Sequence, residues 1–204
     1  MSKGMIGLIP LADVLAAVND FYAKAAGEDG AMWLSAFLQF LQKKNFWPAF
    51  PVWRRIVIGA HESAVGYEAA IEAKGNRLTD WARQILTKTP VASSREELEL
   101  VLVTGAQLGF DKAATRAQIY ERAAAFGLVP CPAEVGLALR EQYQEQPLGE
   151  WILVAMEPIE VSDRYPVVFG VERDDGGRWL NASSGNAVNE WDPGNRWVFL
   201  RRKP

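Results

Sequence analysis

Residues 151–156, Trp151-Ile152-Leu153-Val154-Ala155-Met156, form an uninterrupted apolar stretch in the C-terminal part of the chain. Apolar residues at successive positions place hydrophobic side chains on both faces of a strand, which is typical of a strand inside a sheet. We therefore predict that Trp151, Ile152 or Val154 is buried in the middle of an antiparallel sheet.

The sequence on the C-terminal side of this stretch predicts further strands. Val167, Phe169 and Val171 alternate with smaller or polar residues. The segment 174–177, Asp-Asp-Gly-Gly, is typical of a hairpin turn because its glycines accept positive φ. Residues 197–200, Trp-Val-Phe-Leu, supply the last strand, so we predict an antiparallel meander.

The sequence before residue 150 predicts one strand followed by two helices. Residues 98–103, Leu-Glu-Leu-Val-Leu-Val, alternate and favour a strand. Thr115 and Gln118 have the spacing of a capping box, in which each side chain binds a free backbone N–H at a helix start. Pro132 suits the first position of the second helix, because its missing N–H is not needed there.

The first ninety residues show mostly helical periodicity. Apolar residues recur at spacings of three and four in two early segments, which are 11–22 and 33–41. Ser63 and Thr79 are suitable caps for two further helices. Residues 54–59 are a short β-branched run that fits either a brief strand or an extended linker.

These patterns together predict an α+β fold. It has a helical N-terminal half, then a strand, two helices and a C-terminal antiparallel β-meander. The turn-forming segment 87–94 predicts a boundary, giving a mainly helical region 1–90 and an α+β region 91–204. The alternative is one continuous domain.

Composition narrows the possible functions. The 204 residues are 49% hydrophobic and 23% charged, as in a globular protein, and the net charge of −3 provides no polycationic field for nucleic acid or anionic lipid. The start of the chain has too short an apolar stretch for a signal peptide, so we expect a cytoplasmic protein without membrane contact.

Few residues offer nucleophilic or metal chemistry. Cys131 and His61 are the one cysteine and the one histidine of the chain. A Cys131–His61 dyad is conceivable because Cys131 precedes a predicted helix, but nothing in the sequence brings the two together. The acidic residues lack the spacing of a calcium loop. We expect neither a metal nor a cofactor.

Two specific functions stay open as alternatives to a binding or interaction protein. A hydrolase can use a pair of carboxylates from Glu134, Glu150 and Glu157, with tryptophans stacking on sugar rings. A binder of single-stranded nucleic acid can use interleaved indoles and guanidinium groups near the C-terminus. The residues of this second alternative are Arg173, Arg178, Trp179, Arg196, Trp197, Arg201 and Arg202.

The chain also resembles a group of uncharacterised bacterial hypothetical proteins. The most specific pieces are residues 131–136, Cys-Pro-Ala-Glu-Val-Gly, and 156–159, Met-Glu-Pro-Ile. The resemblance covers about residues 53–202. It implies a bacterial setting and no particular chemistry, because no activity is established for that group.

The leading hypothesis is a binding or interaction protein without catalytic chemistry, accessory to a larger assembly. Its site lies where the helix of residues 131–143 meets the strand of residues 150–156, with Arg140 as an anion clamp and Tyr143 as a stacking wall. The candidate binding residues are Glu134, Arg140, Tyr143, Gln146, Glu150 and Glu157.

The expected partner is an unidentified protein or a small ligand. The N-terminal helices carry an aromatic stripe that fits a homo-oligomer or another partner. The aromatic residues of this stripe are Trp33, Phe37, Phe40, Phe46 and Trp47.

Overall fold

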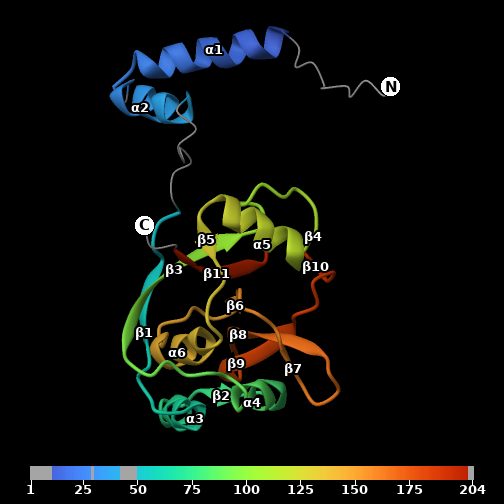
Figure 1. The fold of residues 1–204 in the computed structure, drawn as a ribbon. Helices are drawn as coiled ribbons and strands as arrows, with labels where there is room; N and C mark the ends of the chain where they lie inside the picture. The colour runs from blue at the N-terminus through green and yellow to red at the C-terminus, as the bar shows by residue number, and fades with distance from the viewer. Residues whose placement is uncertain (1–10, 29, 42–49, 202–204) are drawn as a thin grey trace. The chain divides into compact units, whose positions relative to one another are not determined.

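The computed structural model describes residues 11–28, 30–41 and 50–201, and the chain divides into two compact units, residues 1–48 and 49–204 (Figure 1). The division does not coincide with the boundary expected at residue 90. Residues 50–90 contribute strands that pair with strands after residue 90, so they belong to the second unit.

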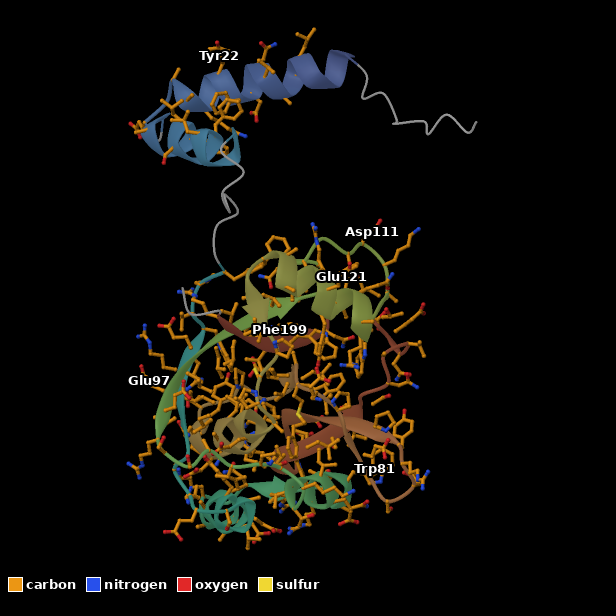
Figure 2. The ribbon with its side chains drawn as sticks, in the orientation of Figure 1. Tyr22, Trp81, Glu97, Asp111, Glu121 and Phe199 are labelled. Atoms are coloured by element: carbon orange, nitrogen blue, oxygen red, sulfur yellow. The ribbon has the colours of Figure 1, made fainter. Side chains whose placement is uncertain are left out.

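The first unit contains a pair of helices, α1 (Leu11–Ala25) and α2 (Gly30–Leu41). Phe21 and Phe37 pack between them, with ring centroids 4.6 Å apart. Tyr22, labelled in Figure 2, is exposed. Of the expected aromatic stripe, Trp33 and Phe37 are also exposed, whereas the Phe40 side chain, Phe46 and Trp47 lie outside the described residues.

The second unit mixes helices with a large, mostly antiparallel sheet. Its helices are α3 (Ala64–Ala73), α4 (Asp80–Leu86), α5 (Arg116–Ala125) and α6 (Glu134–Gln142). The strands before α6 are β1 (Arg54–Ile58), β2 (Arg77–Leu78), β3 (Glu96–Thr104), β4 (Ala114–Thr115) and β5 (Leu128–Val129). Those after α6 are β6 (Trp151–Val154), β7 (Ile159–Glu160), β8 (Pro166–Asp174), β9 (Gly177–Ser184), β10 (Glu190–Trp191) and β11 (Arg196–Arg201).

The strand order of the main sheet is β1-β3-β11-β6-β8-β9-β2. β5 also pairs with β11, β7 pairs with β8, and β4 and β10 form a separate two-stranded sheet. The expected meander is therefore wrong in one respect, because β11 returns to the middle of the sheet. There it runs antiparallel to β3 and parallel to β6.

The central place predicted for residues 151–156 is confirmed. β6 lies between β11 and β8, and Ile152, Leu153 and Val154 are fully buried. The neighbourhood is only partly antiparallel, since the pairing with β11 is parallel.

The expected helical N-terminal half is not clearly shown, because three strands lie among its helices. β1, β2 and β3 all precede residue 105 and belong to the main sheet. Residues 54–58 are thus a strand and not a linker. β1 forms one edge of the sheet, where Arg55 Nη2 pairs with Glu99 Oε1 of β3 at 2.6 Å, and the two-residue strand β2 forms the other edge.

Three capping signals in the sequence agree with the structure, whereas Pro132, expected at the first helical position, lies before Ala133, the N-cap of α6. Thr115 and Gln118 form the capping box at the start of α5, and Ser63 and Thr79 cap α3 and α4. The hairpin between β8 and β9 closes with Asp174 opposite Gly177, whose φ is +130°.

Helices cover the sheet on both faces. Phe199, labelled in Figure 2, and Trp197 pack against Tyr120 of α5. α6 packs against β8 on the opposite face. Gly136 of α6 lies over Phe169. Gly170, which follows Phe169 and so faces the other way, is paired through Leu153 of β6 with Trp197. Figure 1 shows α3 and α4 together near β2 and β9.

Gly136→Ala tests the close approach of α6 to the sheet. A Cβ on residue 136 would lie 2.6 Å from Phe169 Cβ, so the substitution overpacks the core. We expect the free energy of unfolding to fall by about 1–3 kcal/mol in urea titrations, despite the helical preference of alanine. Gly194→Ala, where a Cβ would meet nothing within 4 Å, is the control. Equal stability of the two variants would contradict this packing.

Candidate functional site

Glu134, one of the six candidate residues, is buried and serves to join three segments. Its Oε1 accepts hydrogen bonds from the Tyr67 hydroxyl at 2.7 Å and from Gly59 N at 2.6 Å, and its Oε2 accepts one from Ala92 N at 2.7 Å. These donors come from α3, from the residue after β1 and from the segment before β3. Both carboxylate oxygens bind internal donors, so this buried side chain holds the fold together.

Arg140 and Gln146 form a second buried network. Arg140 Nη1 donates to Gln146 Oε1 at 2.5 Å and to Glu172 O at 3.3 Å, and its Nη2 donates to Tyr143 O. Gln146 Nε2 donates to the carbonyls of Glu150 and Val171. Burial lowers the pKa of Arg140 to about 10. Because its side chain is fully buried, Arg140 does not supply the expected anion clamp.

Tyr143 and Glu150 come together as expected, and Arg196 joins them. The Tyr143 hydroxyl donates to Glu150 Oε2 at 2.7 Å, and Arg196 Nη1 donates to Glu150 Oε1 at 2.7 Å. The Glu150 side chain is 8% exposed and that of Arg196 49%. Burial, helped by the bond to Glu150, raises the pKa of Tyr143 to about 12.

A pocket of about 400 Å³ lies beside this group, where β6 and β11 begin. It combines an indole, an ion pair, an amide and apolar side chains. Its lining residues are Pro147, Leu148, Gly149, Glu150, Trp151, Gly194, Asn195 and Arg196. Tyr143, the expected stacking wall, does not line the pocket. Trp151 does, with its side chain on the face of the sheet opposite to that of Arg196.

The three candidate carboxylates of the hydrolase alternative occupy different environments. Glu134 is buried, Glu150 is paired with Arg196, and Glu157 is exposed. Of the three, the pocket lining includes Glu150. The geometry thus gives no acid and base facing one pocket.

Cys131 and His61 each have a partner of their own. Cys131 is buried, its Sγ lies 3.5 Å from Val198 O, and burial raises the pKa of the thiol. His61 Nε2 lies 3.0 Å from Glu141 Oε2. The buried thiol is therefore a poor nucleophile. Within residues 11–28, 30–41 and 50–201, no three His, Cys, Asp or Glu side chains are placed to hold a metal ion.

The residues of the nucleic-acid alternative do not form one strip. Trp197 is fully buried, and Arg173 and Arg178 bind Gln146 O and Asn76 Oδ1. Arg201 binds Phe50 O. Arg202 lies outside the described residues. Trp197 is therefore not free to stack on a base.

One group that the sequence analysis missed lies across three strands. Trp151 of β6 is paired with Glu172 of β8, which is paired with Trp179 of β9, so the three side chains share one face. We call these three residues the tryptophan row. Asn181 lies beside it and donates to Glu172 Oε2 at 3.1 Å. Strand register brings these residues together, and no local signal in the sequence predicts that register.

Comparison of the chain with protein-family models, curated proteins and solved structures finds no match. Among the helices of the described segments, none has the length and apolarity needed to cross a membrane.

Tyr143→Phe tests the hydrogen bond between Tyr143 and Glu150 through the dependence of stability on alkaline pH. The Tyr143 pKa is raised in the folded state, so the protonated hydroxyl stabilises the fold below about pH 10, and this stability is lost as the pH approaches 12. We expect the free energy of unfolding to fall less steeply between pH 10 and 12 in the variant than in the parent. Parallel pH profiles would show that Tyr143 titrates equally in both states.

Proposed function

We propose that the second unit is a binding domain without catalytic chemistry of its own, and that its ligand occupies the pocket lined by Glu150, Trp151 and Arg196. The observation that carries this proposal is the pocket of about 400 Å³ beside the Glu150–Arg196 ion pair. Pockets of this size with a few directed polar groups are typical of small-molecule sites.

The charges of the lining favour a neutral ligand. Glu150 and Arg196 offset each other, so the pair attracts neither anions nor cations strongly. The half-exposed guanidinium of Arg196 has further N–H donors, and Asn195 offers both a donor and an acceptor. These groups suit hydroxyl groups on the ligand.

The other lining residues favour a ligand with an apolar face. Trp151, Pro147 and Leu148 supply apolar surface next to the polar groups. Sugars and cyclic polyols combine hydroxyl edges with apolar ring faces. The bond from Tyr143 holds Glu150 in place before binding, which reduces the ordering cost.

Arg196→Ala tests the pocket. Glucose, N-acetylglucosamine and inositol are the probes, and saturation-transfer NMR on the full chain measures their binding. We expect at least one probe to bind the parent, and Arg196→Ala to weaken it because hydroxyl donors are lost. Arg55→Ala on the edge strand β1 is the matched control and retains binding. Absence of binding by all three probes, or equal loss in both variants, would overturn the proposal.

We propose a second function, self-association, for the α1–α2 pair. Leu15, Val18 and Tyr22 follow one another at spacings of three and four and are each at least 45% exposed. Leu34 and Leu38 of α2 are also about half exposed, and α2 has no charged residue. Apolar seams of this spacing pack against other helices, and two helical hairpins make a four-helix bundle.

Val18→Glu tests the self-association. Light scattering coupled to gel filtration gives the mass of the full chain over a range of concentrations. We expect the parent to approach the mass of a dimer and the variant to remain monomeric, because a charge enters the seam. Ala16→Glu adds the same charge at an exposed position outside the seam and retains the dimer. A parent that is monomeric at every concentration would refute self-association.

A further inference from the structure

We propose that the ligand of the second unit is a linear, neutral oligosaccharide, and that it extends from the pocket across the tryptophan row of Trp151, Glu172 and Trp179. This inference rests on the proposed function, since Trp151 lines the pocket and is also the first member of the row.

The row and the pocket lie at the same end of the sheet. The hairpin strand β8 binds the pocket loop through two backbone hydrogen bonds, from Gly149 N to Arg173 O at 2.7 Å and from Arg173 N to Glu150 O at 3.0 Å. Glu172 and Trp179 follow on β8 and β9, and all three members of the row are partly exposed. Alternation places the row on the face of the sheet opposite to Arg196, so a ligand that leaves the pocket passes around Trp151, at the start of β6, to reach the row.

The spacing of the row suits a chain of rings. Neighbouring strands are about 4.8 Å apart, so the backbones at Trp151 and Trp179 are separated by roughly 10 Å with Glu172 between them. Two indoles at this separation contact two different rings of one extended ligand. The carboxylate between them accepts hydrogen bonds from the hydroxyl groups of those rings.

The polar groups of the row have capacity for a ligand. Glu172 Oε2 accepts from Asn181 Nδ2, and Asn181 Oδ1 accepts from the Thr79 hydroxyl at 3.4 Å. These bonds fix the orientation of the Asn181 amide. Glu172 Oε1 has no hydrogen-bond donor in the part of the chain that the structure describes, so it can accept from a sugar hydroxyl.

The two indoles are held in place in the unbound protein. Trp179 Nε1 donates to Asp174 Oδ1 at 2.9 Å, and the Arg77 guanidinium lies 5.2 Å from the ring centroid. Trp151 packs against Trp191, with centroids 5.9 Å apart, and its Nε1 would lie 3.1 Å from a Cβ on residue 170. The glycine at 170 thus leaves room for the indole to lie over the sheet. Rings that are ordered in advance lose little entropy on binding.

The charge around the row favours a neutral chain over a nucleic acid. Glu172 and Asp174 belong to the row or contact it, and Asp175 follows in the same hairpin. These carboxylates repel phosphate groups, and the nearby cation Arg77 offsets only part of their charge.

Isothermal titration calorimetry on the full chain tests the inference. The ligands are cellohexaose, maltohexaose and chitohexaose, each compared with its monosaccharide. We expect one hexaose to bind more tightly than its monosaccharide. Trp179→Ala should weaken the hexaose on the order of five- to tenfold and leave the monosaccharide unchanged. Glu172→Gln should act in the same direction without removing an aromatic ring, and circular dichroism checks that both variants fold.

Trp81→Ala is the matched control, because Trp81 of α4 is an exposed tryptophan that packs on Tyr165 outside the row (Figure 2). Failure of all three hexaoses to bind would overturn the inference. A hexaose that binds the parent and the folded Trp179→Ala variant equally would also overturn it. Monosaccharide binding that Arg196→Ala weakens would still support the proposed function of the pocket. Tighter binding of a thymidine oligonucleotide than of any hexaose would assign the row to nucleic acid instead.

Discussion

The position of β11 between β3 and β6 is the constraint on which the second unit depends. Residues Arg196–Arg201 end the described chain, yet they pair with β3 on one side and with β6 on the other. This arrangement buries Trp197, Val198 and Phe199 at the centre of the sheet. It also brings Arg196 to Glu150, so the same pairing that completes the core creates the ion pair beside the pocket.

Buried polar side chains connect separate segments of the second unit by hydrogen bonds. Glu134 joins three separate segments, and Arg140 with Gln146 ties the end of α6 to β8 and to Glu150, the residue before β6. Glu134 and Arg140 resemble site residues in the sequence because each is a charged residue beside apolar ones. In the structure the bonds that these three residues make are all internal, whereas Glu150 and Arg196 lie at the pocket.

The features that the sequence predicts well are those set by neighbouring residues. The capping box at Thr115, the turn at Asp174 and the buried stretch Ile152–Val154 follow from local chemistry. The place of β11 and the tryptophan row depend on register between distant segments, which alternation alone does not specify. Of the six candidate binding residues, Glu150 lines the pocket. Arg196, expected only in the nucleic-acid alternative, lies 46 positions from Glu150 in the sequence, and no local pattern predicts that the two pair.

The two borders of the sheet bear on how copies of this protein can associate. β1 carries Arg55 paired with Glu99 of β3, and β2 has only two residues. Charged side chains and very short strands keep unpaired backbone groups from recruiting another polypeptide, which protects against fibre-like polymerisation. At the β1 border, Val57 N and O are also bound by the Gln142 side chain of α6, so the backbone there is not free to pair with a strand of another copy.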